Sequence, residues 1–328
     1  MNGGEAPQAS PRVLALSGGI GGAKLALGLY QTLPPDTLTV VCNTGDDFRH
    51  LGLHISPDVD TVLYTLAGLA NRELGWGREG ETWTFMEVLE SLGAETWFRL
   101  GDGDLALHVE RTRRLAAGES LEAVVDDVRR RFGIDACIVP MCNEPTPTLV
   151  HTAEGTLAFQ EYFVRRGCEP AVSGFRFQDI DSANPASGFV QALQSPLLEA
   201  VIICPSNPFI SVDPLLGVPG VRAALESCRA PVIAVSPVIG GKAVKGPTAK
   251  MMGELSLPVS AEAVANHYGS LLDGFVLDEA DSALAPRIGA QCLVTRTLMR
   301  DDVHKRALAN EVLRFAHALR GAPDRHDG

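Results

Sequence analysis

The segment from Val13 to Lys24 constrains the fold most, because it joins an apolar strand, a glycine-rich turn and the start of a helix. Val13 to Leu16 predict a short buried strand, and Ala23 to Leu33 carry the helical period until Pro34 ends it. The predicted turn between them contains Ser17, Gly18, Gly19, Gly21 and Gly22. Backbone N–H groups at a helix start lack internal partners, and the helix dipole there favours negative charge. The segment therefore predicts an anion-binding site.

The glycine-rich turn differs from the two common phosphate-binding fingerprints. The dinucleotide fingerprint requires a third glycine where Lys24 stands, and the P-loop pattern requires Ser or Thr where Leu25 follows the lysine. Two interpretations remain open from the residues alone. The turn is either an ordinary connection in an α/β protein, or a phosphate-binding turn to which Lys24 adds a cation.

Composition narrows the class of protein. A chain of 328 residues with 45% hydrophobic and 21% charged residues is typical of a globular protein that buries a large core. A net charge of −12 argues against sequence-independent nucleic-acid binding, and no apolar run reaches membrane-spanning length. Seven scattered cysteines without a CxxC pair favour reduced core residues in a cytoplasmic protein. We predict one α/β domain over residues 12–320, with disordered tails at 1–11 and 321–328.

A second strand and a following helix bring several acids to one edge of the predicted sheet. Leu38 to Asn43 predict a parallel strand that runs into the polar turn Thr44 to Asp47, at the edge where ligands of open parallel sheets bind. Ser56 is the expected N-cap of a helix that begins at Pro57.

Four acids lie between positions 46 and 60, and two interpretations stay open for them. Asp46 and Asp47 suit a turn, while Asp58 and Asp60 complement the dipole of the helix that begins at Pro57. We favour that dipole role for Asp58. Asp46, Asp47 and Asp60 are alternatively candidates to converge on Mg²⁺, which prefers hard oxygen ligands.

The middle of the chain adds one further candidate residue and an insertion. We predict helices at 84–92, 105–117 and 121–132, with Asp104 as the N-cap of the second. Arg99 stands near that cap, as a structural ion-pair partner or a ligand contact. From about 146 to 176 the hydrophobic period changes to alternation, with segments at 148–152 and 156–163. This pattern predicts an antiparallel hairpin inserted in the α/β body.

Two later strands, at 199–204 and 230–236, end in polar turns at the same sheet edge. Ser206 and Asn207 follow the first strand and suit either a helix cap or a nucleotide contact. The second turn carries Gly240, Gly241, Lys242 and Lys245. That set suits either a phosphate-binding loop or a basic loop in solvent. Apolar segments near Phe275 and Cys292 and a helix at 301–319 complete the predicted body.

These segments together resemble the 2-phospho-L-lactate transferases of deazaflavin coenzyme (F-420) biosynthesis. The motifs keep the family's order over residues 13 to about 250. They are Ser17-Gly-Gly-x-Gly-x-x-Lys24, Asn43-Thr-Gly-Asp-Asp47, Pro57-Asp-x-Asp-Thr-Val-Leu-Tyr64, Leu100-Gly-Asp-x-Asp104, Pro205-Ser-Asn-Pro208 and Ser236-Pro-x-Ile-Gly-Gly-Lys-Ala-Val-Lys-Gly-Pro247.

The resemblance implies a Rossmann-like, doubly wound and mostly parallel sheet with an inserted subdomain, in a homodimer. It implies a Mg²⁺-dependent transfer of a phosphorylated three-carbon acid (lactyl, enolpyruvyl or glyceryl) from a guanosine diphosphate-linked donor. The acceptor is 7,8-didemethyl-8-hydroxy-5-deazariboflavin, and GMP leaves. A uridine-nucleotide-binding relative of the same superfamily is the main alternative, followed by a non-catalytic nucleotide sensor and, last, a NAD-linked dehydrogenase.

The resemblance also implies roles for individual residues. Asp46 and Asp60 would hold Mg²⁺, Asp60 would orient or deprotonate the acceptor hydroxyl, and Arg99 would contact the deazaflavin. The remaining residues would bind the nucleotide and its phosphates: Gly18, Gly19, Gly21, Gly22, Lys24, Asn43, Thr44, Ser206, Asn207, Gly240, Gly241, Lys242 and Lys245. Neither Asp47 nor the 146–176 hairpin receives a role.

Overall fold

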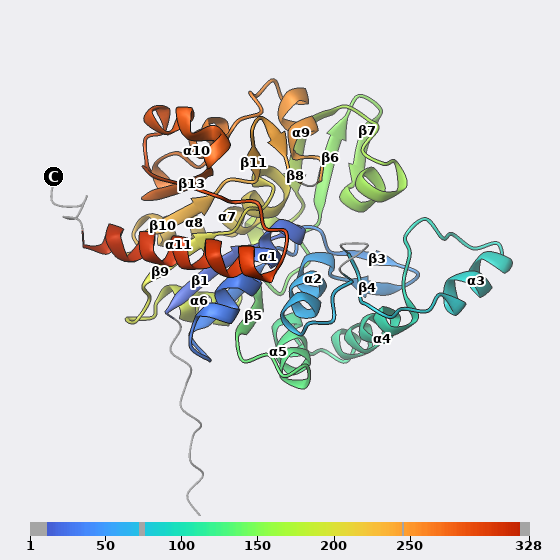
Figure 1. Cartoon of the computed structure of the whole chain (residues 1–328). Helices are drawn as coiled ribbons and strands as arrows, with labels where there is room; N and C mark the ends of the chain where they lie inside the picture. Colours follow the sequence, from blue (N-terminus) through green and yellow to red (C-terminus); the bar gives the residue numbers. More distant parts are fainter. Residues whose placement is uncertain (1–11, 72–75, 245, 322–328) are drawn as a thin grey trace, which may run out of the picture.

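A seven-stranded, entirely parallel sheet forms the centre of the protein in the computed structural model, which describes residues 12–71, 76–244 and 246–321 (Figure 1). The strand order is β14-β13-β10-β9-β1-β2-β5. The strands are β1 Val13–Ser17, β2 Leu38–Cys42, β5 Cys137–Pro140, β9 Ala200–Ile203, β10 Val232–Val235, β13 Gly274–Asp278 and β14 Gln291–Thr295. This architecture confirms the predicted Rossmann-like, doubly wound fold.

The strand order reverses direction between β1 and β9. From β1 the chain first builds outward through β2 and β5, and it then returns to pair β9 with the other side of β1. Ligands of open α/β sheets bind outside the carboxyl ends of the strands at such a reversal. The glycine-rich segment after β1 and the Pro205–Asn207 turn after β9 therefore lie at the expected binding position.

Helices cover both faces of the sheet, because alternate residues of each buried strand point to opposite sides. Ala15 and Val40 join one core, under helices that include α1, α2, α5 and α11, whereas Leu14 and Leu16 join the other, under α6 to α10. The helices are α1 Gly19–Thr32, α2 Pro57–Leu66, α5 Leu121–Arg131, α6 Ser187–Leu193, α7 Asp213–Gly217, α8 Val221–Glu226, α9 Thr248–Glu254, α10 Ala261–Tyr268 and α11 Asp302–Arg320.

Two smaller parts extend from the main body, both to the right in Figure 1. One contains β3 Phe48–His50, β4 Leu53–Ile55, α3 Thr84–Ser91 and α4 Asp102–Ala116, around a small core of Ile55, Met86 and Leu100. The other is the predicted insertion, an antiparallel sheet of β6 Thr148–Thr152, β7 Gly155–Ala158 and β8 Val172–Phe177. The hairpin is confirmed, but its second strand ends at Ala158, and a helical turn over Glu161–Arg165 replaces the predicted extension to Phe163.

Two predicted helix starts are wrong, and both errors have a physical reason. Helix α1 begins at Gly19 rather than Ala23, because contacts distant in sequence hold the glycine run in helical form. At Gly21, a Cβ would lie 2.3 Å from the carbonyl oxygen of Pro205, so glycine permits this close approach. Helix α4 begins at Asp102 with Gly101 as its N-cap, and Asp104 lies inside the first turn, where it accepts a hydrogen bond from Tyr64.

Gly28 of α1 is the basis of a stability prediction. A Cβ at Gly28 would lie 2.3 Å from the backbone oxygen of Lys305 in α11, so Gly28→Ala forces these two packed helices apart. We expect a loss of about 1–3 kcal/mol in the free energy of unfolding, as for other overpacked cores. The exposed helical Gly253 has no heavy atom within 4 Å of an added Cβ, and there Gly253→Ala should gain about 0.5–1 kcal/mol. Urea denaturation measures both changes in the free energy of unfolding. An unchanged midpoint of urea unfolding for Gly28→Ala would contradict the close packing of α1 on α11.

The described helices include none with the length and apolar character that crossing a bilayer requires. All seven cysteines are free thiols; Cys42, Cys142 and Cys204 are buried, and the others are partly buried. Their positions agree with the predicted role of the cysteines as core residues.

Candidate functional site

A cleft of about 690 Å³ lies over the carboxyl ends of β1 and β9. The predicted site residues that line it are Gly18, Gly19, Gly21, Lys24, Asp46, Asp60, Arg99, Ser206 and Asn207. These residues come from segments distant in sequence, and the fold brings them to one rim. The cleft also contains Asp58, Tyr64, Asp104 and His108, which the sequence reasoning did not place in a binding site.

Other predicted site residues lie next to the cleft rather than on its lining. Asn43 and Thr44 are buried behind it, and Gly22 packs against Ser17 and Ser206. Gly240, Gly241 and Lys242 are exposed in the turn between β11 (Val238–Ile239) and β12 (Lys242–Ala243). Lys245 lies outside the described residues. The proposed nucleotide contacts of these residues stay predictions.

The start of α1 is already engaged by protein groups. The Gly18 N–H donates to Ser206 Oγ at 3.1 Å, and the Ser206 hydroxyl donates back to the Gly18 carbonyl at 2.8 Å. The Gly19 N–H donates to Asp58 Oδ1 at 2.7 Å. Asp58 therefore faces the N-terminus of α1 as well as the first turn of its own helix α2. The expected role, which was to complement the dipole of α2, is only part of what Asp58 does.

Two buried carboxylates share one amide beside this helix start. Asn43 Nδ2 donates to Asp46 Oδ1 at 3.1 Å and to Asp58 Oδ2 at 2.9 Å. Burial raises the pKa of Asp46 well above its ordinary value, and the nearby charge of Asp58 raises it further. Burial likewise raises the pKa of Asp58 to about 6. A divalent cation would favour the ionised form of both groups, so their oxygen donors and raised pKa values fit Mg²⁺.

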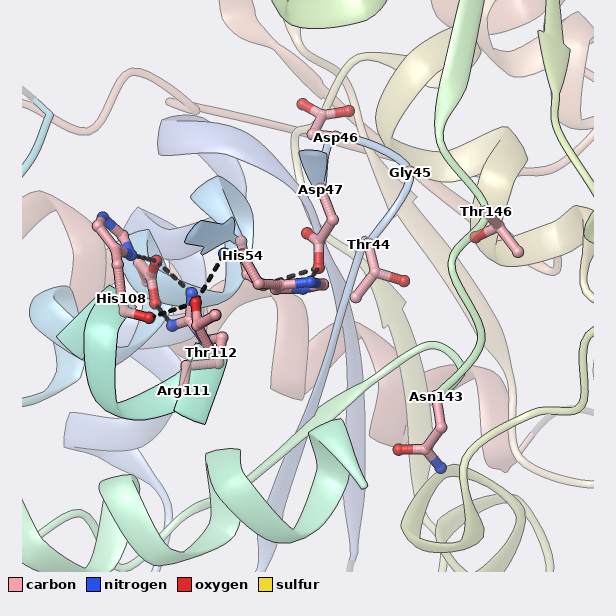
Figure 2. A network of polar contacts seen from close by, with 12 residues as sticks. Thr44, Gly45, Asp46, Asp47, His54, His108, Arg111, Thr112, Asn143 and Thr146 are labelled. Carbon is pink, nitrogen blue, oxygen red and sulfur yellow. Dashed lines mark hydrogen bonds and ion pairs between the residues drawn. The ribbon is translucent and has the colours of Figure 1, made fainter. Parts of the chain in front are cut away.

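Asp47 points away from the cleft and has a structural role. In Figure 2 the side chains of Asp46 and Asp47 leave the turn in different directions, and Asp47 reaches His54. Asp47 Oδ2 lies 3.1 Å from His54 Nε2 and accepts a hydrogen bond from the Ser56 hydroxyl at 2.7 Å. Ser56 is the N-cap of α2 by position, but its side chain makes no cap bond, because it bonds to Asp47 instead.

Asp60 has a different environment from Asp46 and Asp58, because a buried arginine binds both of its oxygens. Arg111 Nη1 donates to Asp60 Oδ2 at 3.0 Å, and Nη2 donates to Oδ1. His108 lies between two carboxylates, with Nδ1 3.7 Å from Asp60 Oδ2 and Nε2 3.3 Å from Asp104 Oδ2. Tyr64 donates to Asp104 Oδ1 at 2.6 Å. Figure 2 shows Arg111 and His108 on the same helix, beside this network.

The sequence reasoning missed His108 and Arg111, although a signal was present. Asp104, His108 and Arg111 stand at i, i+4 and i+7 of α4, which places them on one helix face. Asp60, Asp104 and His108 also bring ligand atoms within 4.8 Å of one another, so they form a second possible metal set. That set includes a nitrogen, which suits Mg²⁺ less well than carboxylates alone.

Aromatic and apolar side chains form another part of the cleft. Trp76, Trp97, Phe98, Phe159 and Phe163 line it. Phe159 and Phe163 stack with their ring centroids 5.4 Å apart. Aromatic side chains grouped in this way suit a planar aromatic ligand.

Arg99 and the insertion both contribute to this part of the cleft. The guanidinium of Arg99 lies 4.2 Å from the ring centroid of Trp83, so this cation is held against an aromatic ring. The insertion supplies Phe159, Gln160 and Phe163 to the cleft, and Gln160 Nε2 donates to the Asp46 carbonyl at 3.3 Å. The insertion therefore forms one wall of the cleft and bonds to the Asn43–Asp47 turn.

The fold and the cleft together define a Rossmann-like α/β protein whose cleft combines a glycine-rich helix start, buried carboxylates and aromatic side chains. The family model described as "2-phospho-L-lactate transferase CofD" matches residues 13–305, and the chain belongs to this family. The predicted family is thus confirmed, and with it the prediction of a transferase. The uridine-nucleotide-binding alternative is not favoured.

Relatives whose names give two different transferred groups match almost the whole chain. A phosphoenolpyruvate transferase of Streptomyces griseus subsp. griseus is 37% identical, covering 94% of this chain and 99% of the relative. A 2-phospho-L-lactate transferase of Methanopyrus kandleri is 40% identical with the same two coverages. A solved structure of a UPF0052 family member from Bacillus halodurans has a TM-score of 0.61 at 15% identity, covering 93% of this chain and 99% of that one. This last likeness shows the fold alone.

Proposed function

We propose that this transferase moves a phosphorylated three-carbon acid from a guanosine diphosphate-linked donor to the terminal ribityl hydroxyl of deazariboflavin in coenzyme F-420 biosynthesis. The hydroxyl oxygen attacks the phosphorus that carries the three-carbon acid, the bond from this phosphorus to the GMP oxygen breaks, and GMP leaves. The observation that carries the proposal is that one cleft joins the glycine-rich start of α1, buried carboxylates and an aromatic wall. The first two suit a diphosphate with its metal, and the third suits a deazaflavin ring.

Phosphoryl transfer of this kind depends mainly on positioning and charge neutralisation. In the proposed complex, Gly18, Gly19, Gly21, Gly22 and Lys24 face the donor phosphates, and Lys24 is held at the cleft by a 3.2 Å bond to the Met299 carbonyl. The proposed nucleotide contacts are Asn43, Thr44, Ser206, Asn207, Gly240, Gly241, Lys242 and Lys245.

We propose that Asp46 and Asp60 hold Mg²⁺, with Asp58 as a further oxygen ligand beside Asp46. When bound, the ion neutralises charge on the diphosphate oxygens. Asp60 also faces the acceptor in this proposal, where it orients the hydroxyl and takes its proton. Arg99, stacked on Trp83, contacts the deazaflavin ring. A homodimer and a cytoplasmic location stay predictions from the family resemblance.

The test uses purified protein with Mg²⁺, deazariboflavin and, in separate reactions, the lactyl, enolpyruvyl and glyceryl forms of the donor. We expect a phosphorylated deazaflavin and an equal amount of GMP, both measured by liquid chromatography with mass spectrometry. Competition between the donors then identifies the preferred acid. The absence of product with all three donors would refute the proposal.

A further inference from the structure

We infer that Arg111 is a positioning residue for the reaction, which acts by fixing the carboxylate of Asp60 toward the cleft. The inference rests on the proposed role of Asp60 and adds that Arg111 sets the orientation of the Asp60 carboxylate. Arg111 is 1% exposed and does not belong to the cleft lining, whereas Asp60 does. Any effect of Arg111 on the reaction must therefore pass through Asp60 or its neighbours.

The contact between the two side chains fixes an orientation as well as a distance. Both terminal nitrogens of Arg111 bind Asp60, one to each carboxylate oxygen. Because the guanidinium is planar and rigid, this fork sets the plane of the carboxylate, which a lysine ammonium cannot do. The outward lone pairs of Asp60 are then held in one direction relative to the cleft.

His108 lies beside Asp60 on a second side, with its Nδ1 3.7 Å from Asp60 Oδ2. His108 is 1% exposed and its ring lies between Asp60 and Asp104, while Tyr64 donates to Asp104. Asp60 and Tyr64 belong to α2, and Asp104, His108 and Arg111 belong to α4. Helix α4, which carries Arg111, begins within the Leu100–Asp104 motif. In this inference the motif contributes to the reaction by placing α4 beside the carboxylate of Asp60.

Stability alone explains the Asp60–Arg111 pair poorly. Removing two charges from water costs about as much free energy as their attraction supplies. Buried ion pairs can therefore often be replaced by apolar residues without a loss of stability. Misplacement of a reacting group by about 1 Å, in contrast, costs roughly 100-fold in rate. A buried arginine that orients a cleft-facing carboxylate is therefore better explained by positioning.

The test compares Arg111→Lys with the matched control Arg114→Lys. Arg114 stands one turn further along α4 and pairs with Glu119 and Asp127, away from the cleft. For Arg111→Lys we expect kcat to fall about 10- to 100-fold, with the KM of the donor within about threefold. The control should keep the wild-type kcat. A wild-type kcat for folded Arg111→Lys would overturn the inference.

A double variant covers the case in which single charge changes prevent folding. Asp60→Asn with Arg111→Gln removes both members of the pair, so no buried charge is left without a partner. We expect this variant to fold, as measured by circular dichroism, and to turn over no more slowly than Asp60→Asn alone. If it is at least about 10-fold slower than Asp60→Asn, Arg111 acts independently of Asp60 and the inference is wrong.

The outcomes also separate this inference from the proposed function. No product from the wild-type protein would mean that the proposed reaction is wrong. An active wild type with an unimpaired Asp60→Asn variant would refute the role of Asp60. A slow Asp60→Asn variant together with a fully active Arg111→Lys variant would refute the positioning role alone.

Discussion

Asp60→Asn should lower kcat at least ~100-fold, because the substitution removes a group that is proposed to orient the acceptor hydroxyl and take its proton. Asp60 is 5% exposed and lines the cleft, so its carboxylate is both shielded from water and available to a ligand. The amide keeps the shape of the side chain but lacks the negative charge and the basic oxygen. Initial rates at saturating substrates measure the effect.

The same substitution leaves Arg111 buried without its anion, which costs roughly 3–5 kcal/mol in comparable cases. Rates must therefore be normalised to folded protein, measured by circular dichroism. Asp127→Asn is the control, because it also removes a carboxylate bound to an arginine of α4 but lies away from the cleft. Near-normal turnover by folded Asp60→Asn would show that Asp60 has a purely structural role, as the partner of Arg111.

Removing Mg²⁺ with a chelator should abolish turnover, and Asp46→Asn should raise the Mg²⁺ concentration for half-maximal rate at least ~10-fold. The reason is that Asp46 presents a buried oxygen donor to the cleft beside Asp58. His108→Gln provides the matched comparison, since His108 belongs to the second possible metal set with Asp60 and Asp104. If His108→Gln raises the Mg²⁺ requirement and Asp46→Asn does not, the ion binds at the second set instead.

The raised pKa values of Asp46 and Asp58 add a pH dependence to this prediction. The pKa of Asp58 rises from its ordinary 3.8 to about 6 on folding, so between these values the folded protein retains a proton that the unfolded chain releases. Without metal, the free energy of unfolding therefore falls as the pH rises through this window. Because Mg²⁺ binds the ionised carboxylates, its stabilising effect should be larger at about pH 7.5 than at about pH 5. An equal Mg²⁺-induced shift in Tm at both pH values would show that these carboxylates do not bind the ion.

The sheet and its carboxyl edge could be predicted because their signals are local. Apolar runs such as Val13–Leu16 and Ala230–Ser236 can be buried in few ways other than as central parallel strands. The polar turns after these strands then had to meet at one edge, which brought Asp46, Asp60 and Ser206 into a common cleft. The start of α1 was missed because glycines favour a turn locally. In the fold, Ser206 and Asp58 accept hydrogen bonds from Gly18 and Gly19, and the Pro205 carbonyl packs closely on Gly21.

Two residues of α4, His108 and Arg111, could not be found in the same way. His108 and Arg111 stand in a helix with many charged residues, and such a helix looks solvated unless its partner is known. Lys242 has neighbouring glycines that suggest a phosphate loop. Its side chain is exposed at the β11–β12 turn, and its contact with the nucleotide stays a prediction.

A crystal structure of the protein with Mg²⁺, GDP and deazariboflavin is the most direct test of the claim that one cleft holds both substrates. We expect the GDP diphosphate at the start of α1 beside Asp46, the ring of deazariboflavin against Phe159 and Trp97, and its terminal ribityl hydroxyl within hydrogen-bond distance of Asp60. A diphosphate bound away from α1, or a ribityl hydroxyl that points away from Asp60, would contradict it.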